Sequence, residues 1–259
     1  MNHGFNRVSA KYFSEVINAL SVKQRKVISD YGFGSLLMYD KCVVPARFIK
    51  WLAQHVDVCT SEIIVNGKFI PFNKMSVHKV LGIPIGGDSL SVDREIGKTF
   101  ILSRFNLSTL PPIRFFGDKI KNKQLLADDD MFICFMIVAL SCFLCPNSNT
   151  YPSTKYMIAF KDLSCVGNID WSLYIYEWLI DAVRKLCMGV GKSFRPIHTL
   201  DGCSYVLAVS LILLNLQLTI IIYFIVKYSY LKFYIMSKIY VCFCCFRSVL
   251  LFCQLASLV

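Results

Sequence analysis

Apolar residues recur at intervals of three and four positions in several stretches of the chain, which is the spacing of one face of an α-helix. The pattern predicts a helical stretch over residues 9–28, a second helix over residues 44–56 and another helix that starts near Asp170. Ser21 and Gln24 have the spacing of a capping box, so a new short helix is expected to begin inside the first stretch. These segments predict a mainly helical chain.

The helix predicted over residues 44–56 has a proline in its first turn, where the missing N–H costs nothing. Phe48, Trp51, Leu52 and His55 would lie on one face of this helix. We interpret His55 as a histidine packed at the edge of that face and not as a metal ligand.

The clearest local signal is the segment SEIIVNGKFIPF, which predicts a small β-hairpin over about residues 62–72. Asn66-Gly67 suits a two-residue turn, because both central positions of such a turn need positive φ. The next segment, NKMSVHKVLGIP, predicts a short helix with Asn73 or Ser76 at its N-cap and Gly82 at its end.

The segment LADDDMFICFMIVALSCFLCP predicts a helix that is buried on all sides. Its uncharged part, Met131–Cys145, is too short to cross a bilayer, because a spanning helix needs about 20 apolar residues. Residues 99–127 show no decisive pattern, apart from the break that Pro111-Pro112 imposes. The predicted fold is therefore a mainly α domain with one small hairpin, followed by a hydrophobic helical tail.

The composition changes near residue 210, which predicts a domain over residues 1–210 and a hydrophobic tail over residues 211–259. The tail contains no Asp, Glu, Gly or Pro. An uncharged stretch predicts a transmembrane helix at about 205–226, because it is long enough to cross a bilayer with some tilt. A second apolar segment, 239–259, is interrupted by a single arginine.

Two interpretations of the tail remain open. The basic residues after the first span favour a cytosolic C-terminal side, which would place a domain without a signal peptide across the membrane. The tail is therefore either a genuine membrane anchor or translated intron sequence at the end of the gene.

The chain has 28 basic and 17 acidic residues, and its formal net charge is +11. All the acidic residues lie at or before Asp201, and four basic residues lie in the tail, so both parts are net basic. A basic domain suits contact with nucleic acid or another anionic surface, or it is simply a lysine-rich solvated surface. The 12 cysteines do not form the spaced framework of a small secreted domain, so we expect a reducing compartment for the domain.

No active site is predicted from the residues. The segment GVGKS at Gly189–Ser193 lacks the first glycine of a phosphate-binding loop and is interpreted as the end of a helix. Cys142 and Cys145 have the spacing of half a zinc site, but a position at the end of an apolar helix favours buried core thiols. The run Asp128–Asp130 either binds a divalent cation or complements a helix dipole, and we favour the second interpretation. We therefore predict no catalytic, cofactor-binding or metal-binding residue.

The segment IRFFGDKIKNKQ interleaves phenylalanines with basic residues. Its candidate nucleic-acid contacts are Arg114, Lys119, Lys121 and Lys123. Such mixing supports phosphate contacts together with base stacking. The alternative is a half-buried strand followed by a solvated loop.

Six segments of residues 25–209 together resemble grass proteins described as aminotransferase-like plant mobile domain proteins. They are DYGFGSLL, FIKWLAQHV, IIVNGKFIPFNKMSVHKVLGIPIGG, CFLCPNSNTYPSTKY, DWSLYIYEWLIDAV and LDGCSYVLAV. The most specific is the apolar hairpin, short helix and Leu-Gly-x-Pro-x-Gly-Gly stop. The resemblance covers the predicted domain and ends near Ser210, where the tail begins.

The resemblance implies a domain related to those of plant transposable elements and of nuclear proteins linked to silencing and genome stability. No catalytic residues are established for that domain, and no pyridoxal-phosphate site is recognisable here. Many grass relatives also carry a C-terminal protease domain that cleaves ubiquitin-like modifiers, which we expect this chain to lack.

We therefore expect a non-enzymatic, transposon-derived protein that binds nucleic acid, chromatin proteins or other proteins. The alternative is a helical protein anchored by its C-terminal hydrophobic segment, with membrane lipid as its partner if the tail is translated. The expected location is a membrane for the chain as written, and the nucleus for the domain without its tail. No cofactor or small-molecule substrate is predicted.

Overall fold

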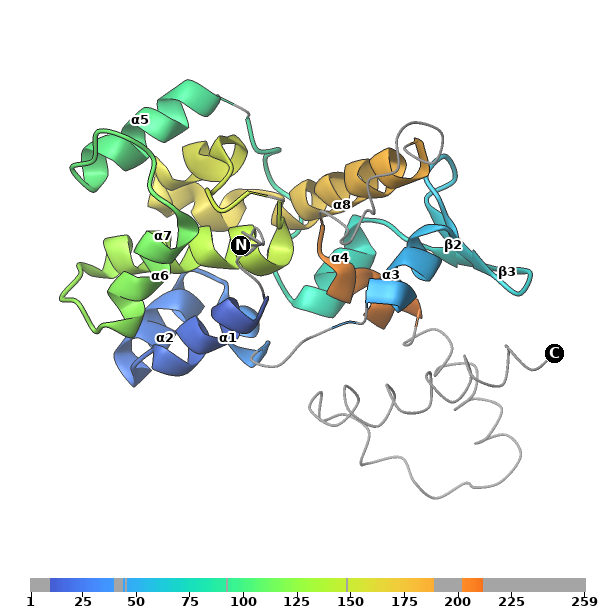
Figure 1. Cartoon of the computed structure of the whole chain (residues 1–259), viewed down its shortest axis with the longest axis horizontal. Helices are drawn as coiled ribbons and strands as arrows, with labels where there is room; N and C mark the ends of the chain where they lie inside the picture. The colour runs from blue at the N-terminus through green and yellow to red at the C-terminus, as the bar shows by residue number, and fades with distance from the viewer. Residues whose placement is uncertain are drawn as a thin grey trace, which may run out of the picture. The chain divides into compact units, whose positions relative to one another are not determined.

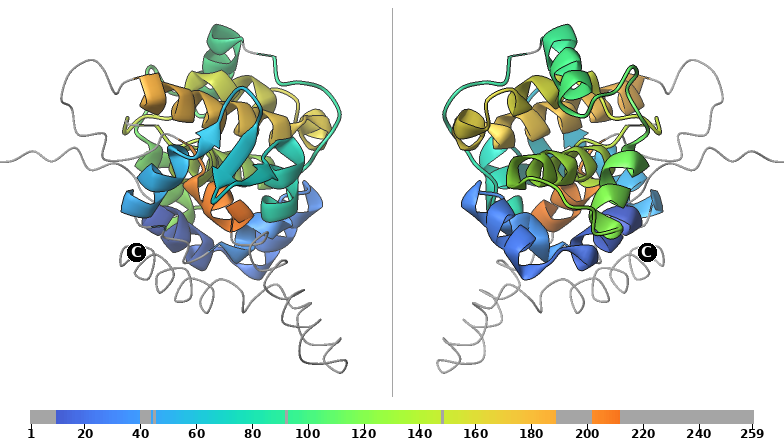
Figure 2. Two further views of the ribbon diagram at one scale, coloured as in Figure 1. Left: turned by 90° about the vertical axis from the view of Figure 1, so that its right-hand side faces the viewer. Right: turned by 90° about the vertical axis from the view of Figure 1, so that its left-hand side faces the viewer.

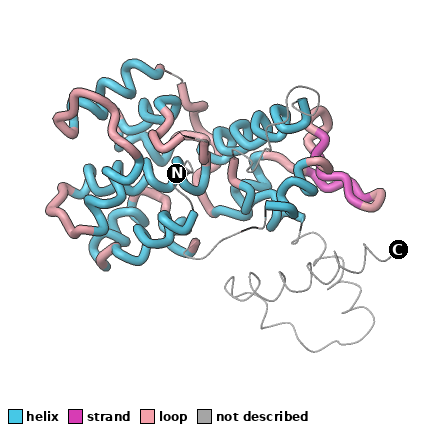
Figure 3. The backbone as a smooth tube through the Cα atoms, in the orientation of Figure 1, coloured by secondary structure: helices cyan, strands magenta, loops and turns pink. Residues whose placement is uncertain are grey.

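The computed structural model describes residues 10–39, 44, 46–91, 93–147, 149–188 and 202–211. The chain divides into two compact units, Met1–Leu207 and Ala208–Val259. The first unit is mainly helical, as predicted, with one small sheet at one end (Figures 1 and 3). Its elements in chain order are α1 (Ala10–Ala19), α2 (Val22–Asp30), η1 (Gly34–Met38), α3 (Ala46–Ala53), β1 (Val56–Asp57), β2 (Glu62–Val65), β3 (Lys68–Pro71), α4 (Lys74–Leu81), α5 (Arg94–Arg104), α6 (Ile113–Lys121), α7 (Asp128–Ala139), η2 (Leu140–Leu144), η3 (Thr154–Phe160), η4 (Leu163–Asn168) and α8 (Trp171–Met188).

The predicted hairpin is confirmed, with Ile63 opposite Ile70 across an antiparallel pair of strands. A two-residue turn needs positive φ at both central positions. Asn66 and Gly67 meet this requirement with φ of 51° and 70°. The sheet also has a third strand, because β1 pairs with β2. The helix predicted over residues 44–56 was therefore too long: α3 ends at Ala53, and the chain then enters the sheet.

The centre of the first unit is α7 together with the π-helical turn η2. Every residue from Met131 to Cys145 is buried, so the predicted all-round burial is confirmed. Phe132 stacks on Tyr31 with ring centroids 4.1 Å apart, and Phe13 packs against Phe135 at 5.7 Å. Each buried aromatic side chain contributes about 1.5–3 kcal/mol of transfer free energy, so this helix is a main source of stability.

The ambiguous region over residues 99–127 holds the second half of α5 and all of α6, and Pro111-Pro112 lies between the two helices. Helix α5 lies directly on the backbone of η3, because Gly97 has no side chain there. A Cβ atom at Gly97 would lie 2.8 Å from the carbonyl carbon of Met157. The close approach explains why a glycine occupies the middle of this helix despite its low helix propensity.

Local capping signals fix both ends of α4, the helix that follows the hairpin. The Asn73 side chain accepts hydrogen bonds from the backbone N–H groups of Met75 and Ser76, so Asn73 is the N-cap of the two residues that the sequence offered. Gly82 ends α4 in the left-handed conformation that glycine favours, with φ of 65°. In the following loop, a Cβ at Gly87 would overlap the carbonyl oxygen of Asn168, so this position also requires glycine.

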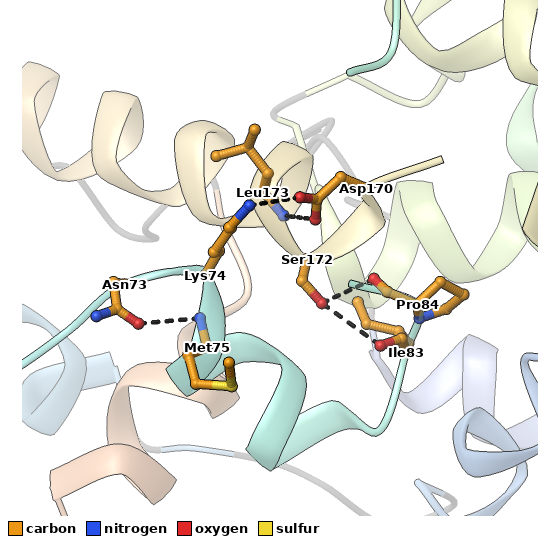
Figure 4. A network of polar contacts seen from close by, with 8 residues as sticks. All are labelled: Asn73, Lys74, Met75, Ile83, Pro84, Asp170, Ser172 and Leu173. Atoms are coloured by element: carbon orange, nitrogen blue, oxygen red, sulfur yellow. Dashed lines mark hydrogen bonds and ion pairs between the residues drawn. The ribbon is translucent and has the colours of Figure 1, made fainter. Parts of the chain in front are cut away.

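Polar contacts join α4 and the loop that follows it to the start of α8 (Figure 4). Lys74 Nζ lies 2.8 Å from Asp170 Oδ2, and the Leu173 N–H donates to Asp170 Oδ1 at 2.9 Å. Ser172 Oγ donates to the carbonyl oxygen of Pro84 at 2.9 Å. Burial raises the pKa of Asp170, but the bonds from Lys74 and the backbone outweigh burial and hold it below its usual range. The carboxylate therefore caps α8 in its charged form.

Within the described residues, no helix is long and apolar enough to cross a membrane. The predicted span at about 205–226 begins inside the first unit, where the Tyr205 ring lies 5.2 Å from Tyr39. The rest of that span, the segment 239–259 and the GVGKS segment lie outside the described residues.

Candidate nucleic-acid interface

The four candidate nucleic-acid contacts lie on and just after α6. Arg114, Lys119 and Lys121 belong to the helix, and Lys123 follows it in the left-handed conformation with φ of 54°. The alternative of a half-buried strand for this segment is therefore wrong. Phe116 is fully buried in the core, so it is not available to stack on a base.

Helix α1 crosses α6 at Tyr12, whose hydroxyl donates to Asp118 Oδ1 at 2.8 Å. Gly117 makes this crossing possible, because a Cβ there would lie 2.7 Å from Cε1 of Tyr12. Burial, and then the bond to Asp118, raises the pKa of Tyr12 well above its ordinary value. The phenol is therefore a permanent donor that fixes α1 on α6.

Aromatic rings hold three of the candidate cations in place. Arg114 Cζ lies 4.8 Å and Lys121 Nζ 5.0 Å from the centroid of the Tyr12 ring. Lys119 Nζ lies 4.6 Å from the centroid of the Phe115 ring. A ring positions a cation without neutralising it, because the ring carries no net charge.

Lys121 differs from the other three candidates because it also forms an ion pair. Its Nζ lies 2.7 Å from Glu15 Oε2. The hydrogen bond from Lys121 holds the pKa of Glu15 below its usual range, so the pair stays ionised at neutral pH. Arg114, Lys119 and Lys123 are thus the candidates best able to neutralise a phosphate.

We call this surface the α1–α6 face. It comprises Lys11, Tyr12, Glu15, Arg114, Phe115, Asp118, Lys119, Lys121 and Lys123. The right-hand view in Figure 2 looks toward the side of the unit that carries α1 and α6. Lys11, Arg114 and Lys123 are exposed on it. Its basic residues outnumber its acidic ones, so the face can attract a polyanion.

The acidic run at the start of α7 forms contacts within the protein. Arg104 Nε donates to Asp130 Oδ1 at 2.6 Å, and the Tyr31 hydroxyl donates to Asp129 Oδ1 at 2.7 Å. Asp128 lies 3.2 Å from a lysine of α2. These pairs join α2, α5 and α7 and agree with the interpretation of the run as a helix-start feature. Among the residues that the structure describes, no group of three or more His, Cys, Asp or Glu is arranged to hold a metal ion.

The cysteines of the CFLC segment are buried in the core. Burial raises the pKa of Cys145 well above its ordinary value, and it raises the pKa of nearby Cys203 to about 12. Protonated buried thiols are poor nucleophiles and poor metal ligands. The placement therefore supports the interpretation of these residues as small core side chains.

Sequence reasoning missed Tyr12, which is the residue that organises the α1–α6 face. Tyr12 is separated from α6 by about one hundred residues, so no local pattern connects them. The one available signal was Gly117, a glycine inside a helical segment, which often marks a close approach of another element.

A family model for a domain of unknown function (DUF8566) matches residues 6–208. No curated protein and no solved structure matches the chain.

Proposed function

This chain belongs to the family defined by the domain of unknown function DUF8566, and we propose that its first unit is a non-enzymatic nucleic-acid-binding module of a transposon-derived nuclear protein. The resemblance to plant mobile domain proteins is part of this proposal. One structural observation supports it most: on the α1–α6 face, neutral rings hold Arg114 and Lys119 in fixed positions without cancelling their charge.

The positive charge of the α1–α6 face suits contacts to backbone phosphates, which do not depend on the base sequence. Lysine and arginine side chains that neutralise phosphates release condensed counterions, so such binding weakens steeply with salt. Three contacts, from Arg114, Lys119 and Lys123, predict a loss of duplex affinity of about 40-fold between about 50 and 200 mM salt. The preorganised cations lower the entropy lost on binding, because their side chains are already held by rings.

The test measures binding of the full chain, in non-ionic detergent, to a short fluorescent DNA duplex by anisotropy over that salt range. The variant is Arg114→Gln with Lys123→Gln, which leaves about one phosphate contact and predicts a loss of only about 4-fold over the same range. The matched control is Lys79→Gln with Lys161→Gln, which removes two exposed lysines elsewhere on the unit. The control is expected to keep the wild-type salt dependence.

Two results would overturn the proposal. One is the absence of binding at the lowest salt concentration. The other is an equal salt dependence for the two double variants, which would place the contact away from the α1–α6 face.

A second candidate function is membrane anchoring, and one sequence observation favours it. The uncharged stretch at about 205–226 is long enough to cross a bilayer as a helix with some tilt. We expect the full chain to stay with membranes after carbonate extraction, and a chain ending at Leu211 to be released. Release of both chains would exclude the anchor.

A further inference from the structure

The outer face of the small sheet carries two neighbouring rows of side chains. Ile63 of β2 is fully buried in the core. Side chains alternate between the two faces of a strand, so its neighbours Glu62 and Ile64 point outward. Their partners on β3, Pro71 and Phe69, share this outer face, and both are exposed.

The row of Ile64 and Phe69 continues onto α3 as a series of aromatic rings. The Ile64 N–H donates to the carbonyl oxygen of His55 at 2.7 Å. The centroids of the His55 and Trp51 rings lie 4.3 Å apart, and those of Trp51 and Phe48 lie 5.9 Å apart. Trp51 is 36% exposed and Phe69 is 64% exposed.

The predicted common face of Phe48, Trp51, Leu52 and His55 is therefore divided between the core and the surface, because Leu52 and Ala53 fill the inner side of α3. We call the outward surface the aromatic strip. It comprises Phe48, Trp51, His55, Ile64 and Phe69. Helix α3 and the sheet lie side by side in Figures 1 and 2. An apolar surface that spans two elements marks an interaction site more often than an isolated apolar residue does.

The second row of the outer face is acidic. Glu62 stands directly opposite Asp57 of β1, and like charges at opposite positions destabilise a sheet. Asp57 Oδ1 accepts bonds from the N–H groups of Cys59 and Thr60. Among the residues that the structure describes, no lysine or arginine pairs with either carboxylate. The pair is therefore a local negative charge on a net basic chain.

The basic side chains described on α3 and β3 do not share the direction of the strip's rings. Lys68 comes directly before Phe69 on β3, so its side chain lies on the opposite face of the sheet. Lys50 comes directly before Trp51, and successive residues of an α-helix are turned by about 100° around its axis. The outer face of the sheet thus combines apolar side chains with carboxylates.

The edge of the sheet favours docking onto the outer face over the addition of a strand. Strand β3 is the edge strand of the described sheet, and the Phe72 N–H donates inward to the carbonyl oxygen of Ser61 at 2.8 Å. Because N–H groups alternate between the two edges of a strand, that of Phe69 faces outward. The next position that faces outward is Pro71, which has no N–H to offer to an added strand.

We propose that the aromatic strip and the pair of Asp57 and Glu62 together dock a peptide segment of a partner protein in which a lysine or arginine lies beside an apolar residue. The apolar side chain covers Ile64 and Phe69, while the cation neutralises Glu62 on the same face of β2. Complementary charge of this kind fixes the register of a partner, and a covered aromatic ring supplies affinity. The inference goes beyond the proposed function, because it assigns a protein partner to a surface outside the α1–α6 face.

The first test selects a phage-displayed library of random peptides on the full chain in non-ionic detergent and sequences the enriched peptides. The wild type is expected to enrich peptides in which Lys or Arg lies close to Leu, Ile, Phe or Trp. Glu62→Lys is expected to lose the preference for basic residues. The matched control is Glu95→Lys, which reverses an exposed charge on α5, at the other end of the unit from the sheet (Figure 1). The control is expected to enrich the wild-type set.

The second test measures the affinity of the most enriched peptide, carrying a fluorophore, by anisotropy. Phe69→Ala is expected to weaken binding about 5- to 30-fold, as truncation of an important interface ring does. Glu62→Gln is expected to weaken it about 2- to 5-fold, the effect of losing one exposed ion pair, and less at high salt. Arg114→Gln with Lys123→Gln alters only the α1–α6 face and is expected to bind like the wild type.

The inference fails on any of three results. The first is enrichment of the same peptides by the wild type and Phe69→Ala. The second is a set of enriched peptides without a basic residue. The third is a sedimentation experiment in which the full chain is a dimer that Phe69→Ala dissociates, because the occupant of the strip is then a second copy. None of these results concerns duplex binding by the α1–α6 face, so the inference and the proposed function fail separately. Unchanged thermal unfolding of the variants shows that a lost affinity is not a lost fold.

Discussion

The α1–α6 face and a second surface, the aromatic strip of Phe48, Trp51, His55, Ile64 and Phe69, use aromatic rings in opposite ways. On the α1–α6 face, the cations Arg114, Lys119 and Lys121 of the protein itself lie over the rings of Tyr12 and Phe115. On the aromatic strip, the rings stack on one another and stay partly open to solvent. The first surface therefore offers charge held by rings, and the second offers rings that remain partly open to solvent.

The difference shows that the position of a ring relative to the core decides its role. Tyr12 is 3% exposed and bonds to Asp118 across two helices, so its ring belongs to the structure of the unit. Phe69 is 64% exposed on a strand, so its ring adds little to folding. A residue that contributes little to stability but exposes apolar area is the better candidate for binding.

The sharpest test of this comparison replaces each ring in turn by alanine. Tyr12→Ala is expected to lower the free energy of unfolding by about 3 kcal/mol, because it empties a buried aromatic site and leaves Asp118 without its donor. Phe69→Ala is expected to change it by less than about 0.5 kcal/mol, as an exposed substitution does. Urea unfolding of both variants gives the two values. Equal losses of unfolding free energy in the two variants would show that Phe69 contributes as much to stability as Tyr12 does.

A smaller effect is expected from Gly117→Ala, which tests how closely α1 lies on α6. The added Cβ would lie 2.7 Å from the Tyr12 ring. Such overpacking costs about 1–3 kcal/mol, and better helix propensity offsets up to about 1 kcal/mol of this cost. The free energy of unfolding should therefore fall by about 1 kcal/mol. A matched glycine in the first unit, Gly67→Ala, introduces no contact but is strained by its positive φ, so it separates crowding from backbone strain.

Local signals in the sequence predicted much of the fold, because they depend on neighbouring residues only. The Asn66-Gly67 turn and the capping box of Ser21 and Gln24 have the predicted form, and Asn73 is one of the two N-caps that were predicted for α4. The uncharged run of α7 was long enough to predict burial on every side. In each case a few adjacent residues determine the conformation, so one sequence is sufficient.

The features that were missed depend on residues far apart in the chain. Strand β1 has two residues and forms only because β2 lies beside it. The four candidate cations were named from their own segment, but two of them, Arg114 and Lys121, lie over the ring of Tyr12 from another helix. Apolar spacing placed Trp51 with Leu52, yet Leu52 and Ala53 fill the inner side and leave Trp51 outside. Spacing alone cannot rank the apolar residues that compete for the core.

The smallest expected effect concerns the ion pair that distinguishes the α1–α6 face from the strip. Lys121 holds the pKa of Glu15 below its usual range, so ionised Glu15 favours the folded state. This contribution is present above the unfolded pKa of about 4.3 and is lost as the pH falls through the folded pKa. The stability difference between the wild type and Glu15→Gln should therefore be present at neutral pH and vanish in acid. High salt should also reduce it, because an exposed pair is screened.

Chemical unfolding of the wild type and Glu15→Gln across the acid range measures this difference, with Phe69→Ala as the comparison. Phe69 has no titratable group, so its small effect should follow no such titration. A Glu15→Gln difference that stays constant into strong acid would mean that the carboxylate acts through its packing and not through its charge. The ion pair of Glu15 and Lys121 would then no longer distinguish the α1–α6 face from the aromatic strip. The cation–ring contacts of Arg114 and Lys119 would remain as the difference between the two surfaces.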